Sequence, residues 1–453
     1  MYVSYCRLCG HMKLGKASIF TDIVPDVTVA VASLGPKDAA YDCVEQIDQQ
    51  RENVRIGVGA GVKRLRKEGC AEITVDPTQV PEAAAEASLL ASWMFQEFKS
   101  PGSKKQQITV SPHGGENEEW SSGAILGDCQ NWARYLADMP ANKMTPVDLA
   151  QAALDTLCPL GVHVEARDID WIKAQNMQAF LTVAKGSCET PIFLEANYNG
   201  GSGAPILIAA KGVTFDSGGL CLKKPKYMEE NRASMSGAAA VLAAIKATAL
   251  FKLPLNISCV IPLCENMVSG QCMKVGDVVS ALNGLSIQIE NTDMEGRLML
   301  ADALVYGQHK YKPSLVVDVA TFTHGILLAM GGGAFGCFSN SGEAWDNMMA
   351  AGAHTGDRPW RFPLWKYYHK QLTNEPAVDL RNKGSGRAGP CLGAAFLENF
   401  VCGPWIHLDI TGVGKLGAGR VPPYLSSRRM TGRPARTLAH FLRLLAHDYN
   451  KNK

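Results

Sequence analysis

The sequence has almost no net charge and no long hydrophobic run. Its 453 residues contain 45 Lys and Arg against 43 Asp and Glu, which leaves a formal net charge of +2. A balanced charge gives no electrostatic reason to expect a nucleic acid or an anionic membrane as partner. No apolar run reaches the roughly 18 residues that a membrane-spanning helix needs. We therefore expect a globular chain with neither partner, long enough for two or three domains.

Motifs that would assign some common functions are also missing. There is no GxSxG turn of the kind that carries a nucleophilic serine. The glycine run 331–333 is not followed by the Gly-Lys-Ser/Thr of a phosphate-binding loop. Gly57, Gly59 and Gly61 lie inside a helical pattern rather than between a strand and a helix, so they do not predict a dinucleotide site. The basic stretch 62–67, VKRLRK, is interpreted as a solvated helix face.

The 14 cysteines are scattered without the spacing of a disulfide framework. In a chain of this size, that pattern indicates reduced thiols and predicts a cytoplasmic location. The first 20 residues contain three Lys or Arg residues and no acidic residue, which leaves a mitochondrial presequence as the alternative. Cys6 and Cys9 form a single CxxC. Because no second pair follows at zinc-site spacing, coincidence is favoured over a metal site.

Hydrophobic periodicity divides the chain into two parts. Residues 1–116 have the pattern of a small α/β domain, and the polar stretch 111–120 marks its end. A linker helix is predicted within 117–140, with its helical pattern over 118–138. The other elements expected in this part are a strand at 27–34, a helix at 42–69 and a strand at 71–76.

Residues 141–453 form the expected second, larger domain. Apolar strands alternate there with alanine-rich helical stretches, and the clearest strands are 205–210, 256–263 and 314–320. This alternation predicts an α/β fold with a mostly parallel central sheet flanked by helices on both faces. In such sheets the chemistry lies at the carboxyl ends of the strands, where the connecting loops emerge.

Charged residues gather in two loops that follow predicted strands. The first, KGVTFDSGGLCLKK, contains Lys211, Asp216 and Lys223, and the second, NTDMEGRLML, contains Asp293, Glu295 and Arg297. Carboxylates crowded into one cleft repel each other unless they are protonated or bridged by cations. Hard divalent ions, or zinc, would bridge them. The alternative, which the spacing leaves open, is that Asp216 and Asp293 cap helices.

The second loop resembles the signature of the leucyl aminopeptidases, peptidase family M17, which usually reads NTDAEGRL. Further motifs with close family counterparts occur in the family's order: KGVTFDSGG, PLCENM, GDVV, TGDRPWRFPL, HLDITGV and MTGRPARTL. The resemblance covers nearly the whole chain, although the amino-terminal end looks short, as if an opening strand were missing. It implies the two-domain fold of this family, with a small N-terminal domain and a larger metallopeptidase-like domain.

The resemblance also implies a hydrolase that uses two divalent ions, Zn²⁺ or Mn²⁺, to remove the amino-terminal residue of a peptide. The positions that match metal ligands are Asp216 and Glu295, which would bridge both ions, Asp293 on one ion and Lys211 on the other. Lys223 would stabilise the oxyanion. Arg297 would hold a bicarbonate that serves as proton shuttle.

One ligand of the family's set is replaced in this chain. The family segment usually reads MRADMGGAA, whereas this sequence has NRASMSGAA, with Ser234 at the position of the carboxylate. A serine hydroxyl is neutral, so the ion that shares Lys211 loses its own anionic ligand. We expect that second metal site to be weak or empty. Glu230 would share a helical face with Ser234 and is the alternative ligand, although a surface position is the default for a glutamate.

The family's pocket for the terminal side chain differs as well. Its positions are matched here by Asn231, Thr321, His324, Thr411 and Gly414, and four of the five depart from the usual residues. A leucine side chain would meet unpaired polar atoms in such a pocket, which is unfavourable. His324 is interpreted as a packed or solvated side chain in a pocket that is no longer used. The alternative is a new catalytic or metal-binding group.

Two functions follow from these substitutions. The first is a divergent, catalytically degenerate paralogue, such as the sperm-type leucyl aminopeptidases, kept for a structural or assembly role. Family members form hexamers that are dimers of trimers, so we expect a homohexamer or a related hetero-oligomer with paralogues. The second is an active aminopeptidase with altered metal use and altered specificity for its peptide substrate. The retention of six site residues, Lys211, Asp216, Lys223, Asp293, Glu295 and Arg297, favours the second.

Overall fold

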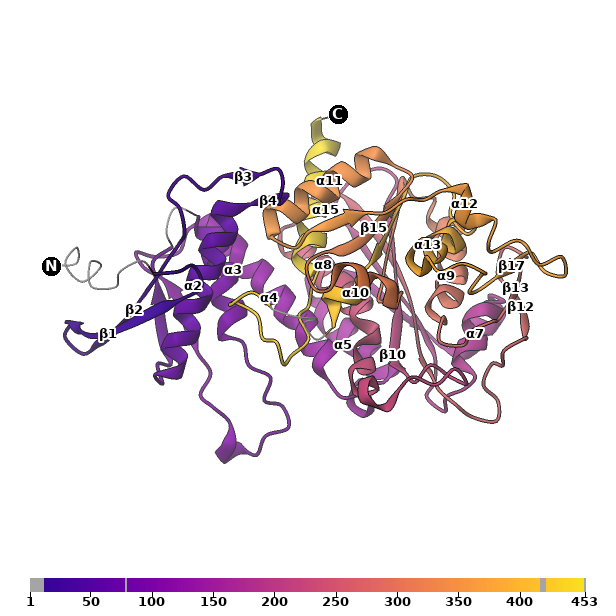
Figure 1. The fold of residues 1–453 in the computed structure, drawn as a ribbon, viewed down its shortest axis with the longest axis horizontal. Coiled ribbons are helices and arrows are strands. Elements are labelled where there is room, and N and C mark those ends of the chain that lie inside the picture. The colour runs from indigo at the N-terminus through magenta and orange to yellow at the C-terminus, as the bar shows by residue number, and fades with distance from the viewer. Residues whose placement is uncertain (1–11, 78–79, 416–420, 452–453) are drawn as a thin grey trace.

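The computed structural model describes residues 12–77, 80–415 and 421–451, which form two lobes of unequal size (Figure 1). The smaller lobe holds the N-terminal elements, coloured indigo to purple, and the larger lobe holds the rest of the chain. Both lobes combine helices and strands, so the predicted two-part α/β architecture is confirmed. Cys6 and Cys9 lie outside the described residues, as does most of the predicted presequence.

Three strand pairs and two helices build the described part of the smaller lobe. Antiparallel pairs join β1 (Ala17–Val24) to β2 (Val27–Ala32) and β3 (Tyr41–Asp42) to β4 (Ile47–Asp48), and a parallel pair joins β5 (Glu72–Val75) to β6 (Thr109–Pro112). The helices are α2 (Gln49–Lys67) and α3 (Pro81–Ser92), and the turn η1 (Pro101–Ser103) precedes β6. The strand at 71–76 is confirmed, and so is the one at 27–34, where β2 ends two residues early.

The helix predicted over 42–69 begins later than expected, at Gln49. Asp48 is its N-cap, because the Oδ1 atom of Asp48 accepts a hydrogen bond of 3.1 Å from the backbone N–H of Arg51. The residues before the cap pair with each other in β3 and β4. A local hairpin therefore uses backbone groups that the sequence pattern assigned to the helix.

The helix α4 spans Glu118–Asp138, as predicted, and lies between the two lobes (Figure 1). It packs against α3 on one side and against helices of the larger lobe on the other. A Cβ atom at Gly123 would lie 2.1 Å from the carbonyl oxygen of Glu82, so only glycine allows α3 and α4 this close approach. The domain limits 1–116, 117–140 and 141–453 stay a prediction, because α4 contacts both lobes.

A nine-stranded sheet forms the centre of the larger lobe. Its order is β16-β15-β18-β14-β9-β11-β8-β7, with β10 paired to β11. The strands are β7 (His163–Arg167), β8 (Ile192–Asn199), β9 (Ile206–Ala210), β10 (Gly212–Asp216), β11 (Asn256–Asn266), β14 (Leu315–Ala320), β15 (Phe335–Ser339), β16 (Pro359–Arg361) and β18 (Trp405–Asp409). The central strands β18, β14, β9, β11 and β10 run parallel, whereas β15 on β18 and β8 on β11 are antiparallel. The mostly parallel sheet is confirmed.

Helices and a second, smaller sheet surround this sheet. The helices are α5 (Pro146–Leu157), α6 (Ile169–Ala174), α7 (Gln178–Ala184), α8 (Ser236–Leu250), α9 (Gly296–Tyr311), α10 (His324–Met330), α11 (Gly342–Thr355), α12 (Lys366–His369), α13 (Gly389–Glu398), α14 (Thr411–Gly414) and α15 (Ala435–Lys451). The short 3-10 turns are η2 (Ala141–Lys143), η3 (Cys158–Leu160), η4 (Pro225–Tyr227) and η5 (Glu229–Met235). The smaller sheet has the order β12-β13-β17, formed by β12 (Val278–Ser280), β13 (Ser286–Gln288) and β17 (Leu380–Arg381).

Both faces of the central sheet are covered, as successive residues of β9 show. Ile206, Ile208 and Ala210 belong to a hydrophobic core shared with residues of α4, α5, α8 and α15. Leu207 and Ala209 belong to a second core, shared with residues of α7, α9 and α13. Neighbouring side chains of a strand point to opposite faces, so each core fills one side of the sheet.

One helical stretch within the described residues is long and apolar enough to cross a membrane by length and composition. It runs over Glu229–Leu250, which combines η5 and α8. Its apolar window is 89% buried inside the protein, where α8 packs against α4 and α15. Lys246 interrupts the stretch, so it meets the criterion by overall composition and is not an unbroken apolar run of that length. The burial marks this stretch as a core helix of the larger lobe.

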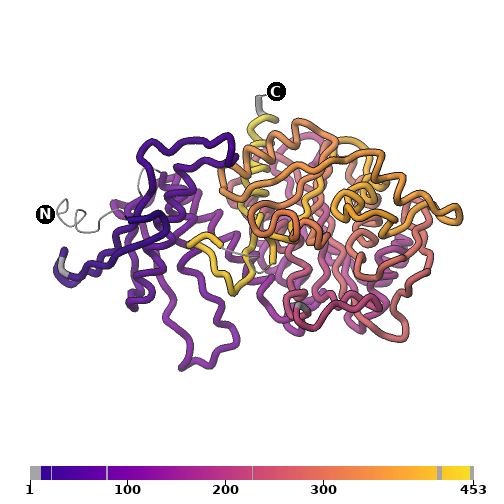
Figure 2. Tube along the Cα trace, viewed as in Figure 1, coloured from indigo at the N-terminus to yellow at the C-terminus, as the bar shows by residue number. Residues whose placement is uncertain are grey.

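The C-terminal part of the chain ties the two lobes together. Figure 2 shows the yellow stretch before α15 passing close to the smaller lobe. There the hydroxyl of Tyr424 donates to the Oε1 atom of Glu52 at 2.9 Å, and the ammonium of Lys63 donates to the carbonyl oxygen of Leu425. Both hydrogen bonds join α2 to the stretch before α15. The smaller lobe therefore packs on this C-terminal stretch as well as on α4.

A buried glutamate connects several helices around this junction. Glu82 of α3 accepts hydrogen bonds of 2.8 Å each from Arg51 of α2, Ser122 of α4 and Arg443 of α15. The Nε2 atom of His354 in α11 lies 3.0 Å from the same carboxylate. Burial by itself would raise the pKa of Glu82, but the contacts with His354 and Arg443 outweigh it and hold the pKa well below its usual range.

Replacing Glu82 with glutamine is expected to make the protein less sensitive to acid. A carboxyl group with a depressed folded-state pKa adds stability above its unfolded pKa of about 4.5, and this stability is lost as the pH falls below that value. The urea midpoint of Glu82→Gln should therefore fall less between about pH 6 and about pH 3.5 than that of the wild type. The exposed Glu72→Gln serves as control. Parallel losses in all three proteins would contradict the assignment.

Candidate metal centre

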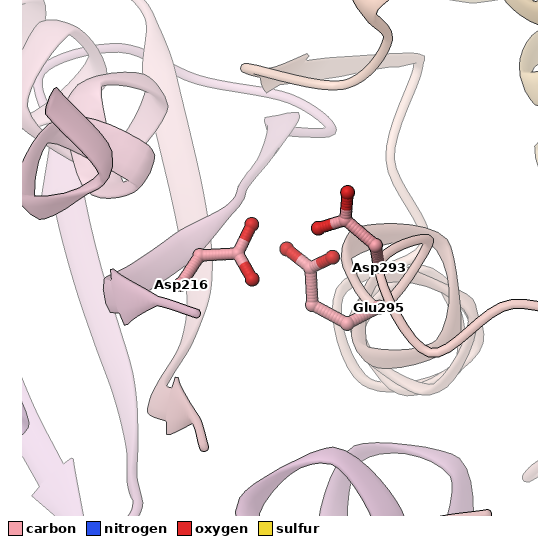
Figure 3. Close-up of side chains that lie close together, drawn as sticks. All are labelled: Asp216, Asp293 and Glu295. Atoms are coloured by element: carbon pink, nitrogen blue, oxygen red, sulfur yellow. The ribbon is translucent and has the colours of Figure 1, made fainter. Parts of the chain in front are cut away.

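Three acidic side chains meet beside the carboxyl end of β10 (Figure 3). Asp216 is the last residue of β10, and Asp293 and Glu295 lie just before α9. Each offers one carboxylate oxygen, and these oxygens lie within 4.8 Å of one another. The loop of Asp293 and Glu295 follows β13, which belongs to the small three-stranded sheet rather than to the main one. The structure thus brings the two predicted loops together from two different sheets.

Neither aspartate caps a helix, so that alternative is wrong. The Oδ1 atom of Asp216 accepts hydrogen bonds of 2.9 Å from the backbone N–H of Gly218 and from the side-chain amide of Asn266. No helix begins at this turn. The N-cap position of α9 is occupied by Glu295, and its side chain makes no capping hydrogen bond. The carboxylates of Asp293 and Glu295 therefore make no helix-capping hydrogen bond at α9.

Lys211 lies between β9 and β10, and its side chain reaches the cluster. Its ammonium nitrogen lies 2.6 Å from the Oε1 atom of Glu295 and donates to the carbonyl oxygen of Thr321 at 3.0 Å. A Cβ atom at position 296 would lie 2.8 Å from the Cδ atom of Lys211, so Gly296 leaves the space through which this lysine passes. The contact with Glu295 does not have hydrogen-bond geometry, and Oε1 remains a buried oxygen without a hydrogen bond.

Lys223 stands between the two aspartates. Its ammonium nitrogen lies 3.0 Å from the Oδ2 atom of Asp216 and donates to the Oδ1 atom of Asp293. Burial alone would lower the pKa of Lys223, but Asp216, Glu295 and Asp293 outweigh it and raise this pKa above its ordinary value. The side chain therefore carries a permanent positive charge at the edge of the cluster.

Electrostatics make the carboxylate cluster unfavourable without a cation. Burial and then repulsion from Asp216 raise the pKa of Glu295 to about 7, and the same two causes raise the pKa of Asp293. The pKa of Asp216 is lowered despite burial, because Lys223 and Lys211 stabilise its charge. Three clustered carboxylates, one with an oxygen that lacks a hydrogen bond, fit one divalent cation with a preference for oxygen ligands.

Arg297 lies next to this cluster in an almost closed environment. Its Nη1 atom donates to the carbonyl oxygen of Asn382 at 2.5 Å, and its guanidinium lies 5.2 Å from the ring centre of Phe322 and 5.9 Å from that of Phe396. The Nε atom is buried without a hydrogen-bond partner. Burial lowers the pKa of Arg297 to about 10, so the group is still charged at neutral pH. Such a guanidinium fits a small anion.

Ser234 lies on the Lys211 side of the centre. It is 1% exposed, and its carbonyl oxygen accepts a hydrogen bond of 3.0 Å from the hydroxyl of Thr321, the residue whose own carbonyl receives Lys211. The segment around it, η5, is a 3-10 helix rather than an α-helix. Ala233, directly before Ser234, has non-helical backbone angles (φ −88°, ψ 16°), so η5 is kinked between Glu230 and Ser234. The regular α-helical spacing assumed for these two residues is therefore absent.

The residues predicted to line the substrate pocket lie on several elements around the centre. Asn231 and Thr321 are buried, Gly414 is buried at the end of α14, and His324 is exposed at the start of α10. The hydroxyl of Thr411 donates to Asp409 at 2.6 Å and accepts from the backbone N–H of Phe322 at 2.8 Å. His324 is thus placed as a solvated side chain, and the polar group of Thr411 is used within the protein.

Three further residues reach the site and were missed from the sequence. Asn266 orients Asp216, and Asn382 accepts from Arg297. Lys415 is partly buried, and its ammonium donates to the Oδ1 atom of Asn231 at 2.9 Å. Asn266 lies within the quoted motif PLCENM, so the motif itself was a signal for it. Lys415 directly follows Gly414, but nothing in the pattern GVGK indicates that its side chain turns inward.

The fold and the site together define a two-domain α/β protein with a buried carboxylate and lysine centre that suits a divalent cation. Comparison with known protein families assigns the chain to such a class. Residues 131–439 match the catalytic domain of the cytosol aminopeptidase family, and residues 23–102 match the N-terminal domain of that family. The chain belongs to this family, peptidase family M17.

Individual proteins agree with this assignment. The chain is 42% identical to the cytosol aminopeptidase of Xenopus tropicalis and 41% identical to that of Homo sapiens; each match covers 96% of this chain and 85% of the relative. A solved structure of the bottromycin maturation enzyme BotP in complex with Mn has a TM-score of 0.87 and 28% identity, covering 98% of this chain and 96% of that one. Family membership and this Mn complex support a divalent metal as cofactor of the centre.

Proposed function

We propose that this chain is an M17 protein whose aminopeptidase activity is strongly impaired and that serves mainly a structural or assembly role. One observation carries the proposal. Ser234 is buried beside the carbonyl that receives Lys211, and it supplies a neutral hydroxyl where the family has a carboxylate. The first metal site keeps Asp216, Asp293 and Glu295, whereas the second is weak or empty.

The chain's own residues retain parts of the family's chemistry. Asp216, Asp293 and Glu295 would hold a divalent ion, which would supply Lewis acidity for a substrate carbonyl. Lys223 places a fixed positive charge beside this position, suited to a developing oxyanion. Arg297 offers its unpaired Nε–H to a small anion such as bicarbonate. Loss of one anionic ligand weakens the second ion, and even changes outside the first ligand sphere typically cost about 10–100-fold in metal affinity or activity.

Metal identity, assembly and location are part of the same proposal. Mn²⁺ or Zn²⁺ is the proposed metal, and the Mn complex of BotP supports the choice of Mn²⁺ as probe. The family's homohexamer, a dimer of trimers, or a hetero-oligomer with paralogues is the proposed assembly. The relatives' name, cytosol aminopeptidase, supports a cytoplasmic location for this chain. No nucleic acid or membrane is a proposed partner.

The second candidate is an active aminopeptidase that releases amino-terminal residues from peptides with an altered specificity. It is favoured by the geometry of the retained residues. Lys211 and Lys223 both contact carboxylates of the cluster, and Arg297 lies just beyond Glu295 on α9. Under this candidate, the polar lining of the pocket near Asn231 and Thr321 would select polar or small terminal residues.

Hydrolysis of a panel of fluorogenic aminoacyl amides distinguishes the two. Wild type and Ser234→Asp are assayed with Zn²⁺, Mn²⁺ or Co²⁺, with Glu295→Ala as background. We expect turnover by Ser234→Asp to exceed that of the wild type by at least about tenfold, because the variant restores a metal-binding carboxylate.

Robust turnover by the wild type that Glu295→Ala abolishes would overturn the impaired reading and leave the second candidate. A silent wild type and a Ser234→Asp variant with measurable turnover support the proposal and show that the missing carboxylate contributes to the defect. Sedimentation of the same preparations tests the assembly role: a hexamer is expected, and a stable monomer at micromolar concentration would contradict it.

A further inference from the structure

Lys415 presents a positive charge to the side of the centre where the carboxylate is missing. Its ammonium donates to Asn231 at 2.9 Å. Asn231 and Ser234 are both buried on η5, three residues apart, with a kink at Ala233 between them. The backbone just before the lysine is close as well: a Cβ atom at Gly414 would lie 3.4 Å from the Cβ atom of Ser236.

The charge of Lys415 belongs to the same electrostatic system as the cluster. Burial is the first cause that lowers its pKa, to about 8, and repulsion from Lys211 and Lys223 adds to it. Attraction from Asp216 and Glu295 acts in the opposite direction. With a pKa near 8 the side chain is predominantly protonated at pH 7. Lys415 is therefore a cation close to the cluster that the sequence motifs did not indicate.

Counting charges shows what this lysine changes. The cluster brings three carboxylates; Lys211 and Lys223 contact it, and the charge of Lys415 interacts electrostatically with Asp216 and Glu295. One divalent ion, with Lys211 acting as a neutral ligand, leaves a small positive excess of one charge. A second divalent ion would raise that excess to three charges in a largely buried site. A neutral Ser234 in place of a carboxylate and the ammonium of Lys415 together make the local charge two units more positive than a site with the carboxylate and a neutral residue at position 415. This difference equals the charge of one divalent cation.

We propose that the Lys415 ammonium takes the electrostatic place of the second divalent cation, so that the centre holds one metal ion and one internal lysine cation. The inference rests on the proposed function in one respect, namely that the carboxylate cluster binds a divalent ion. It goes further in assigning the loss of the second ion to two residues, Ser234 and Lys415, that act on the same side of the site. Restoring the carboxylate alone then leaves the ammonium in place.

Mn²⁺ binding by the full chain tests this assignment. Wild type, Ser234→Asp, Lys415→Met and the double variant are titrated with Mn²⁺ in equilibrium dialysis, and bound metal is counted by mass spectrometry. We expect one Mn²⁺ per chain in the wild type and two in the double variant. The second-site Kd of the double variant should be at least about tenfold lower than that of Ser234→Asp alone. Electron paramagnetic resonance should show an isolated Mn²⁺ in the wild type and a spin-coupled pair in the double variant.

Two controls separate charge from packing. Lys415→Gln keeps a polar group near Asn231 but removes the charge, so in the Ser234→Asp background it should act like Lys415→Met. Lys224→Met removes an exposed lysine of the neighbouring loop and should change nothing. Thermal unfolding of each protein shows that the variants fold. If Lys415→Gln leaves the second site weak while Lys415→Met strengthens it, packing rather than charge is responsible and the assignment is wrong.

The remaining outcomes are equally decisive. Two tightly bound Mn²⁺ ions in the wild type would overturn the role of Lys415, whether or not the protein hydrolyses peptides. Full binding of a second ion by Ser234→Asp alone would also overturn it. Absence of Mn²⁺ binding in every variant would remove the metal centre itself, and the inference with it. Peptidase activity of a wild type that holds one Mn²⁺ would instead overturn only the impaired function.

Discussion

Glu295→Ala is expected to lower the affinity for the first Mn²⁺ by at least about 100-fold, more than any other single substitution in the site. Loss of groups outside the first ligand sphere already costs about 10–100-fold. Glu295 is 1% exposed, its Oε1 atom has no hydrogen bond, and burial with the charge of Asp216 raises its pKa to about 7. Of the three carboxylates, this one gains most from a nearby cation.

The readout is the stabilisation that Mn²⁺ gives to the folded protein. A ligand present at about 100 times its Kd stabilises by about 2.7 kcal/mol, and a hundredfold weaker Kd reduces this to a few tenths of a kcal/mol. Urea unfolding with and without Mn²⁺ should therefore show a large midpoint shift for the wild type and almost none for Glu295→Ala. Glu229→Gln, an exposed carboxylate of η5, is the matched control and should keep the full shift.

A second comparison separates binding from folding. Glu295→Gln keeps the shape of the side chain and removes the charge that burial and Asp216 oppose. In the metal-free state this variant should be at least as stable as the wild type at about pH 8, because the raised pKa means that the folded protein disfavours the charged form. A wild-type Mn²⁺ shift in Glu295→Gln would show that the ion binds elsewhere.

The sequence was informative about the site wherever the ligands lie in short motifs. Asp216, Asp293 and Glu295 were predicted to meet, and they do so within 4.8 Å. Strand ends and glycine turns position such residues through their sequence neighbours, so a short motif is enough to predict them. The contact of Lys415 with Asn231 joins residues 184 positions apart and is visible only after folding. No local periodicity encodes it.

Helix type and helix faces were harder to predict, for physical reasons. Glu230 was paired with Ser234 on α-helical spacing, but η5 is a short 3-10 segment with a kink at Ala233. The basic stretch 62–67 was read as solvated. In the structure Arg64 is exposed and paired with Glu68, whereas Arg66 donates to a carbonyl of α3. A helix that packs between other elements has several buried sides, and charged residues on them look like a surface until their partners are known.

Glu86→Ala is expected to destabilise the protein by about 3–5 kcal/mol, because Arg436 loses its carboxylate partner and Arg55 keeps only Glu52. Glu86 of α3 is fully buried between two guanidinium groups. The Nε atom of Arg55 in α2 lies 2.7 Å from its Oε2 atom, and Arg436 of α15 donates to the same oxygen. Burial alone would raise the pKa of Glu86, but Arg55 and Arg436 hold it below its usual value.

An exposed ion pair in the same lobe is the matched control. Arg64 lies in the last turn of α2, and Glu68 is the C-cap of this helix. Their charged groups are 3.0 Å apart, and the side chains are 46% and 38% exposed. Such pairs contribute about 0–1 kcal/mol, so Glu68→Ala should change the unfolding midpoint little. Equal effects of Glu86→Ala and Glu68→Ala in urea unfolding would show that the buried network contributes no more to stability than the exposed ion pair.

Replacing Glu86 together with Arg55 and Arg436 tests what this buried triad contributes, while Glu52 keeps its hydrogen bond from Tyr424. A buried ion network exchanged for apolar residues of similar volume is often neutral or stabilising, whereas removal of one partner is costly. The triple variant Arg55→Met, Glu86→Leu, Arg436→Met should therefore recover much of the stability that Glu86→Ala loses. Because α2 and α3 belong to the smaller lobe and α15 to the larger one, the network fixes how the lobes dock. If the triple variant is stable but loses its Mn²⁺-dependent shift, the charges matter for the metal centre of the larger lobe rather than for overall stability.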